Sequence, residues 1–341
     1  MKKIVKRVLF SRHGIRYPLF KNEKMIEKYG KDIVDWDFDK KEMGVLTKKG
    51  MLIENLFGQN LRDIMQINDN DDIKFYCNTT ERTYTTSRAL SLAMTPYKEQ
   101  KINRAANDFK SLDKRFNTLV FDENLLNHEL IKEIDKSLMP VYERIEKLYD
   151  LKDGTLKNNS TKLSVDKRGY IVVKGALMEA TDLADVAVLK YYEGVDLDKI
   201  FKIEVEDVVD EIKYISIAKD MFLDAIFADR RYIESSDDNV YKMLLEELNS
   251  GDRLTCLVGH DSNIATITKM FNVDLRIDSR CMIEKYPIGA KLLFNIYDDN
   301  TYEMLYIFYH YEDIRNIGFN KPIIKRLKVG ELDEKNNFSN N

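Results

Sequence analysis

Short apolar runs of the kind found in β-strands gather towards the two ends of the chain. Residues 4–10 form one such run, residues 72–78 a second and residues 254–258 a third. Residues 291–297 and 302–308 flank a polar turn at 298–301, which predicts a β-hairpin. We expect this hairpin to complete a sheet whose strands come from both ends of the sequence.

The middle of the chain has a helical pattern instead. Residues 125–149 and 205–227 carry apolar side chains three and four positions apart among many charges, which indicates amphipathic helices. We therefore predict an inserted, mainly helical cap over residues 96–249. Residues 1–95 and 250–332 would form an α/β core, and residues 333–341 a polar tail.

Composition is typical of a folded enzyme and argues against other classes. The 341 residues, 44% of them hydrophobic, can fill a sizeable core, and no apolar run is long enough to span a membrane. A net charge of -4 without a long basic block argues against a nucleic-acid partner. Lys6 and Arg7 interrupt any apolar export signal, so we expect a cytoplasmic protein as the chain stands. A periplasmic or secreted location is expected if an export signal has been removed.

The most informative segment follows the first predicted strand and places His13 between two permanent cations, Arg12 and Arg16. Flanking guanidinium groups repel a protonated imidazole but clamp a phosphoryl dianion. A neutral imidazole nitrogen can displace oxygen at phosphorus, giving a phosphohistidine that water hydrolyses without a metal. We predict that His13 is this nucleophile and that Gly14 lets the backbone turn sharply beside the substrate. The alternative is a basic strand end that only solvates itself.

A second polar segment follows the predicted strand at 254–258 and leads into a helical pattern at 264–271. His260 would donate a hydrogen bond to the phosphoryl oxygens, and Asp261 would protonate the departing alkoxide as general acid. The alternative is a helix cap with an incidental histidine. Because Asp261 must be protonated while His13 is not, we expect activity to be highest below neutral pH.

Arg82 lies just past the predicted strand at 72–78, before a helical stretch that ends near residue 93. Candidate phosphate ligands therefore follow three separate strands, and open α/β sheets place their ligand crevice at the carboxyl ends of their strands. Arg88 falls within the helix and is expected to be a surface residue.

These segments resemble the signature of the histidine acid phosphatases. The likeness rests on RHGIRYP at 12–18, on Arg82 and on the histidine-aspartate pair, and it extends in the family's order over 44–50, 191–194, 258–265 and 287–291. The last four segments look most like the bacterial glucose-1-phosphatases. The resemblance implies a phosphoglycerate mutase-like α/β fold, with a mixed sheet and helices on both faces. It also implies hydrolysis of sugar or inositol phosphates through a phosphohistidine.

The same resemblance assigns roles to individual residues. It implies that His13 is the nucleophile, that Asp261 is the proton donor, and that the phosphate ligands are Arg12, Arg16, Arg82 and His260. Glu193 would line the side of the site that meets the leaving group. Its position before Gly194 is equally typical of a polar residue in the last turn of a helix.

The chain also departs from the exported members of that family. Cys77, Cys256 and Cys281 form an odd, widely spaced set, and we expect buried, reduced thiols. No Cys/His cluster occurs in the sequence, so neither a metal nor another cofactor is expected. The expected partner is a small-molecule phosphomonoester, without nucleic acid or membrane, and a homodimer is left open.

Two other functions fit the same residues. A phosphomutase or phosphotransferase would pass the phosphoryl group from His13 to a second substrate instead of water. A non-catalytic protein would only bind a phosphate-bearing ligand, although binding alone does not require a proton donor such as Asp261.

Overall fold

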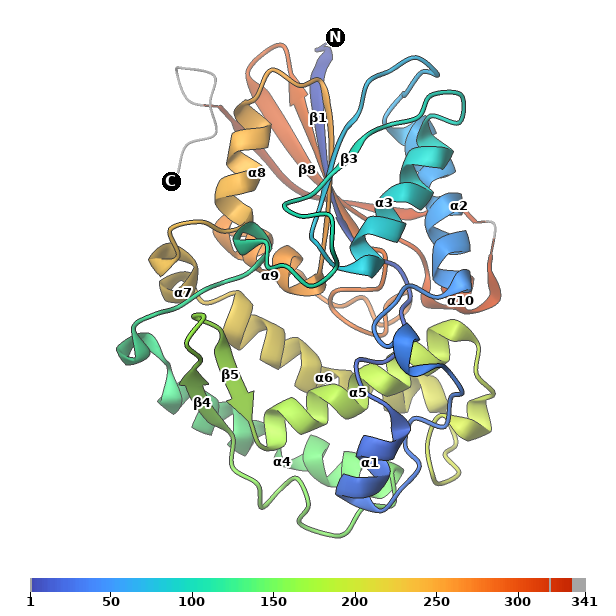
Figure 1. Ribbon diagram of the computed structural model, residues 1–341, viewed down its shortest axis with the longest axis vertical. Helices are drawn as coiled ribbons and strands as arrows, with labels where there is room; N and C mark the ends of the chain where they lie inside the picture. Colours follow the sequence, from blue (N-terminus) through green and yellow to red (C-terminus); the bar gives the residue numbers. More distant parts are fainter. Residues whose placement is uncertain (1, 319, 333–341) are drawn as a thin grey trace.

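The structure is a computed structural model that describes residues 2–318 and 320–332. Its main sheet has the strand order β3-β2-β6-β1-β7-β8-β9 (Figure 1). The strands are β1 (Ile4–Arg12), β2 (Lys74–Cys77), β3 (Ile102–Asn103), β6 (Leu254–Gly259), β7 (Lys291–Tyr297), β8 (Thr301–Phe308) and β9 (Ile323–Glu331). All five strands predicted from apolar runs are confirmed, and the predicted hairpin is the antiparallel pair β7–β8.

The direction of the strands changes at β1. Strand β6 pairs in parallel with β1 on one side and β2 on the other, and β3 pairs in parallel with β2. Strands β7, β8 and β9 continue from β1 as antiparallel neighbours. Arg12 lies opposite Gly259, and Cys77 lies opposite Val258. The predicted mixed sheet is confirmed, and β1, β2 and β6 end at the same edge.

Helices cover both faces of the sheet because successive side chains of a strand point to opposite sides. On β1, Leu9 packs in an apolar cluster with α2 (Lys48–Ile64) and α3 (Glu81–Met94). Its neighbours Val8 and Phe10 pack in a second cluster with α8 (Val240–Asn249) and α9 (Asp261–Met270). Figure 1 shows the two helix pairs on opposite sides of the strands.

The middle of the chain is mainly helical, in the lower half of Figure 1. It contains α4 (His128–Leu148), α5 (Ala176–Glu193), α6 (Val208–Phe227) and α7 (Arg230–Ser235). The predicted helices at 125–149 and 205–227 are confirmed. Each begins three residues later than predicted, because Asn127 and Asp207 accept hydrogen bonds from the first helical N–H groups.

Other elements of this half were not predicted. Strands β4 (Lys162–Val165) and β5 (Ile171–Lys174) form a separate hairpin, and α1 (Asn22–Tyr29) lies beside α4 and α5 in Figure 1. The Tyr29 hydroxyl donates to Glu179 of α5 over 2.7 Å. The division into a core and an inserted cap at residues 96 and 249 stays a prediction. The shorter helices are α10 (Tyr311–Asn316) and the 3-10 turns η1 (Lys40–Glu42), η2 (Lys114–Phe116), η3 (Glu123–Leu125) and η4 (Leu197–Lys199).

The expectation that β7 and β8 complete the sheet is wrong, because β9 pairs with the outer edge of β8. Its sequence, IIKRLKVGE, mixes apolar residues with lysine and arginine, and none of its residues is fully buried, so a search for apolar runs did not detect it. Charged side chains are common on edge strands, where they hinder pairing with other chains. The predicted polar tail at 333–341 lies outside the described residues.

The three cysteines are buried and unpaired, as expected. Burial raises the pKa of the Cys77 thiol to about 11 and that of Cys256 to about 12, so both stay protonated at neutral pH. Within the described part of the chain, no helix is both long and apolar enough to cross a membrane.

A fully buried ion pair supports the loop that leaves β1. The Lys291 ammonium lies 2.7 Å from Glu54 Oε2 and also donates to the Gly289 carbonyl oxygen over 2.7 Å. Gly14 packs closely on this pair, since a Cβ there would lie 2.8 Å from Glu54 Cγ and 3.1 Å from the Gly50 carbonyl oxygen. The Gly14 backbone is not left-handed. The glycine is needed for close approach of α2, and the predicted role in a sharp turn is wrong.

Removing the lysine of this pair should strongly destabilise the protein. In Lys291→Met the Glu54 carboxylate loses its buried counterion, and we expect the free energy of unfolding to fall by about 3–5 kcal/mol. Urea denaturation measures this change. The double variant with Lys291→Met and Glu54→Leu should recover most of the loss, because no charge stays buried. A single variant as stable as the wild type would contradict the argument.

Candidate active site

The carboxyl ends of β1, β2 and β6 meet at a cavity of about 470 Å³. Backbone hydrogen bonds hold its rim together: the His13 N–H donates to the Gly259 carbonyl oxygen over 3.0 Å, and the Asn78 N–H donates to that of Val258 over 3.0 Å. Helices α5 and α6 form the opposite wall. Of the seven predicted site residues, five line this cavity, namely His13, Arg16, Arg82, His260 and Asp261.

His13 is buried, with 3% of its surface exposed. Its Nδ1 lies 2.8 Å from the Gly14 carbonyl oxygen, which can only accept a hydrogen bond, so Nδ1 carries the hydrogen and Nε2 keeps its lone pair. Burial first, and then the positive charge of Arg82, hold the pKa of His13 well below its usual value. The imidazole is therefore neutral and has a free nucleophilic nitrogen at neutral and mildly acidic pH.

The second histidine, His260, is fixed as a hydrogen-bond donor. The Asn78 Oδ1 accepts from the Thr79 N–H over 2.7 Å, so the Asn78 Nδ2 is the group that donates to His260 Nε2 over 2.7 Å. His260 Nδ1 therefore carries the hydrogen. It lies 3.5 Å from Nη2 of Arg82, which is also a donor. Two donors that face each other without an acceptor form a site for an anionic oxygen.

Arg82 is the second residue of α3, in its first turn. No carboxylate of the described residues forms an ion pair with it, and its Nε is buried without a hydrogen-bond partner. Burial, followed by repulsion from Arg16, lowers its pKa to about 9, which still leaves it charged at neutral pH. A half-buried cation without a counterion is unfavourable, and an anionic ligand offsets that cost.

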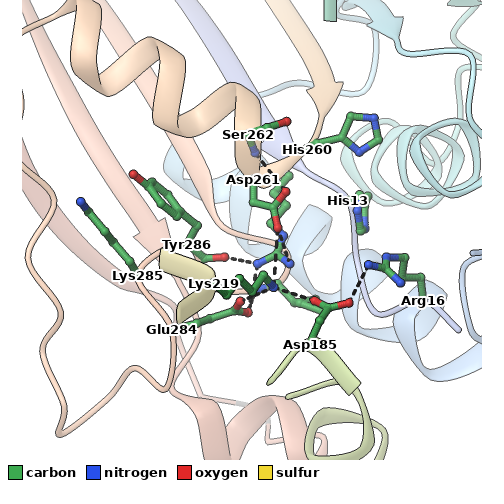
Figure 2. A network of polar contacts seen from close by, with 12 residues as sticks. His13, Arg16, Asp185, Lys219, His260, Asp261, Ser262, Glu284, Lys285 and Tyr286 are labelled. Carbon is green, nitrogen blue, oxygen red and sulfur yellow. Dashed lines mark hydrogen bonds and ion pairs between the residues drawn. The ribbon is translucent and has the colours of Figure 1, made fainter. Parts of the chain in front are cut away.

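The other cations of the site are paired. Arg16 donates to Asp185 of α5 over 2.7 Å, and the other carboxylate oxygen of Asp185 accepts from Lys219 of α6 over 2.7 Å. Lys219 also lies 2.8 Å from Glu284 and 3.7 Å from Asp261. Figure 2 shows Lys219 between Asp185 and Glu284, below Asp261. The ammonium group thereby links the helical wall to the loops of the sheet.

The role of Arg12 as a phosphate ligand stays a prediction, and the contacts that the structure shows for it are with protein groups. Its guanidinium is only 1% exposed and is absent from the cavity lining. It donates to Glu284 over 3.0 Å and to the Tyr286 carbonyl oxygen, and its Nη2 lies 3.0 Å from Oδ2 of Asp261. Arg12 therefore holds Asp261 in place, and its Nε has no hydrogen-bond partner among the described residues.

Asp261 is the first residue of α9, and its Oδ1 accepts from the Ser262 N–H over 3.0 Å. Burial raises its pKa, but the combined attraction of Arg12 and Lys219 is stronger and holds the pKa well below the usual range. The carboxyl is therefore ionised when the site is empty. A proton donor at this position requires acidic conditions or a bound anion that offsets the two cations.

Glu193, predicted to line the leaving-group side of the site, does not line the cavity. It is the last residue of α5, followed by Gly194 in the left-handed conformation, and its carboxylate accepts from the Thr47 hydroxyl over 2.8 Å. It is absent from the cavity lining. The alternative interpretation, a polar residue in the last helical turn, describes this position. Arg88 is exposed on α3, as expected.

Asp185, Lys219, Glu284 and Asn78 were not identified from the sequence. Asp185 and Lys219 carried a weak signal, because each is a charged residue on the buried side of a helix with apolar neighbours. Glu284 lies in a loop between α9 and β7 and carried none. Within the described residues, no group of three or more His, Cys, Asp or Glu side chains could hold a metal ion.

The chain resembles known phosphatases in both sequence and structure. It is 23% identical to the glucose-1-phosphatase of Salmonella typhimurium, over 91% of this chain and 81% of that protein. The phytase of Hafnia alvei in complex with tartrate superposes with a TM-score of 0.82 at 14% identity, over 96% of this chain and 91% of that one. The phytase of Citrobacter braakii superposes with a TM-score of 0.80 at 15% identity, over 100% of this chain and 95% of that one. No family model matches the chain.

These similarities support the predicted resemblance to the histidine acid phosphatases. The structural likeness shows that this chain has the fold of the two phytases. The roles of individual residues in the cavity stay proposals, and they are argued from the geometry above.

Replacing Arg82 should separate anion binding from folding. In Arg82→Met a half-buried cation without a carboxylate partner becomes an apolar side chain, so we expect a higher melting temperature than the wild type in phosphate-free buffer. Inorganic phosphate should raise the melting temperature of the wild type but hardly that of the variant, because the variant binds phosphate weakly. Arg88→Met, on the exposed face of the same helix, is the control and should behave like the wild type. A full response of Arg82→Met to phosphate would contradict the assignment.

Proposed function

We propose that this protein is a histidine acid phosphatase that hydrolyses phosphomonoesters through a phosphohistidine at His13. One observation carries the proposal. The neutral Nε2 nitrogen of a buried histidine shares a cavity with an unpaired arginine and a histidine donor that face each other 3.5 Å apart. A nucleophile beside hydrogen-bond donors that can bind an anion is the arrangement that phosphoryl transfer requires.

In the first step, Nε2 of His13 attacks phosphorus and the bond to the ester oxygen breaks. Asp261, protonated in the complex, transfers its proton to that oxygen, so the leaving group departs as an alcohol. In the second step, Asp261 takes a proton from water as the water oxygen attacks the phosphohistidine. The N–P bond breaks, and inorganic phosphate and neutral His13 are released.

The charges around the cavity match this cycle. At acidic pH Asp182 of the cavity wall, whose pKa is raised to about 7, is mostly protonated. The cations Arg12, Arg16, Arg82 and Lys219 then exceed the carboxylates Asp185, Asp261 and Glu284 by one. Protonation of Asp261 raises the excess to two, which equals the charge of a phosphate dianion. Binding of the dianion therefore favours uptake of the proton that the first step consumes.

The substrate class is a sugar phosphate or an inositol phosphate. The support comes from the similar proteins, one named for glucose 1-phosphate and two named phytases. The cellular location and the homodimer stay predictions.

The nucleophile can be tested by trapping the intermediate. Rapid acid-free quenching of the wild type with ³²P-labelled substrate should leave label on His13 that is stable in alkali and lost in acid. His13→Ala should lose turnover of p-nitrophenyl phosphate by at least about 10⁴-fold and keep its fold by circular dichroism. Assays contain a chelator. Normal turnover by the variant would show that the nucleophile is misassigned, and label passed to an added alcohol instead of water would indicate a phosphotransferase.

The dependence on pH should reveal the charge that controls Asp261. Activity should rise as the pH falls below neutral, because the low pKa of Asp261 leaves it ionised at higher pH while His13 stays neutral. Lys219→Met removes a cation 3.7 Å from Asp261 and should move the alkaline limb of the kcat profile upward by roughly one pH unit.

Lys219→Arg keeps the charge and is the matched control, for which we expect an unchanged limb. Lys219→Gln provides a second neutral variant if the methionine variant is unstable. An alkaline limb that stays in place in both neutral variants would exclude control of Asp261 by Lys219.

A further inference from the structure

A second carboxyl group of α5 faces the cavity and is not used by the mechanism. Asp182 lines the cavity and forms no hydrogen bond or ion pair with any described residue. Asp185, three positions later on the same helix, is fully engaged by Arg16 and Lys219. The two aspartates lie side by side on the helix, since residues three apart are about 5–6 Å apart on one face.

This spacing relates Asp182 to the proposed phosphate site. Arg16, in the loop after β1, belongs to that site, and its guanidinium donates a hydrogen bond to Asp185. Asp182 lies one helical turn towards the start of α5, where the wall continues with apolar side chains, Met178 on α5 and Phe222 and Ile226 on α6. The leaving group of a phosphomonoester held by the cations would extend along this wall of the cavity.

The state of Asp182 suits a neutral, hydroxylated group. Burial, and then repulsion from Asp185, raises the pKa of Asp182 to about 7, while Arg16, Lys24 and Lys28 act in the opposite direction. Below neutral pH the protonated carboxyl both donates and accepts hydrogen bonds, and above it the carboxylate still accepts them. In either form it pairs with a hydroxyl group.

This part of the cavity is poorly suited to a second phosphate group. Apart from the cations of the phosphate site, the lining contains only Lys110 and Arg168 as cations among the described residues. Lys110 is exposed, and Arg168 already pairs with Asp166 over 3.1 Å. Lys24 and Lys28 of α1, whose charges act on Asp182, are exposed and absent from the cavity lining, and Lys28 pairs with Glu179 over 2.8 Å. A second phosphate inside the cavity beside Asp182 would therefore meet a carboxyl group and apolar side chains.

We propose that Asp182 recognises hydroxyl groups of the leaving group and that the cavity selects monophosphates of small polyhydroxylated molecules over polyphosphorylated ones. This inference rests on the proposed function. It goes beyond it by assigning a specificity residue and by separating the two substrate classes that the similar proteins suggest.

The test compares kcat/KM for three substrates at one acidic pH: glucose 1-phosphate, myo-inositol hexakisphosphate, and p-nitrophenyl phosphate, whose leaving group has no other hydroxyl. The wild type should prefer glucose 1-phosphate to the hexakisphosphate by about tenfold or more. Asp182→Ala should lower kcat/KM for glucose 1-phosphate by roughly tenfold while changing that for p-nitrophenyl phosphate less than about twofold. Asp182→Asn, which still donates and accepts hydrogen bonds, should retain most of the activity.

Asp198→Ala, an exposed aspartate away from the cavity, is the matched control and should leave all three values unchanged. The proposal is overturned if the wild type prefers the hexakisphosphate, or if Asp182→Ala lowers the values for glucose 1-phosphate and p-nitrophenyl phosphate equally. If Asp182→Ala does not fold, Asp182→Leu takes its place in the test. Loss of the preference for glucose 1-phosphate over p-nitrophenyl phosphate in Asp182→Leu supports the proposal, and an unchanged preference overturns it. A wild type that hydrolyses none of the three substrates refutes the proposed function itself.

Discussion

The parallel pairing of β6 with both β1 and β2 is the constraint on which the site depends. It brings the ends of three strands to one edge of the sheet, so that segments more than 170 residues apart in the sequence share one cavity. An antiparallel β6 would place His260 and Asp261 at the opposite edge, far from His13. The alternation of side chains along β1 then packs helices on both faces and keeps that edge in place.

The edge gathers more charge than a protein interior tolerates without pairing. Most of these groups are held in one chain of ion pairs, from Arg16 through Asp185, Lys219 and Glu284 to Arg12. Arg82 stands outside the chain, without a carboxylate of the described residues. The site is therefore incomplete as a set of charges, and an anionic ligand supplies what is missing. Binding of an anion therefore also neutralises the excess positive charge of the site.

The helical half of the molecule does more than cover the cavity. Through Asp185 and Lys219, α5 and α6 orient Arg16 and control the charge around Asp261. The same helices supply the apolar wall and the free carboxyl of Asp182. Helices α5 and α6 therefore contribute both to the electrostatics of the proposed phosphate site and to the wall proposed to contact the leaving group.

Sequence alone predicted five strands of the main sheet and four of the helices. It also pointed to His13, Arg16, Arg82, His260 and Asp261, which the structure brings to one cavity, because each of these residues follows or closely follows an apolar run. Such local patterns record which residues a strand delivers to its end. They do not record ion pairs between distant segments, and so only the tertiary structure decided that Arg12 binds Glu284 and Asp261, that Lys219 enters the site, and that Glu193 lies outside it. Likewise, Gly14 is explained by contact with α2. Periodicity is a property of neighbours in the chain, whereas the pairing of buried charges is a property of neighbours in space.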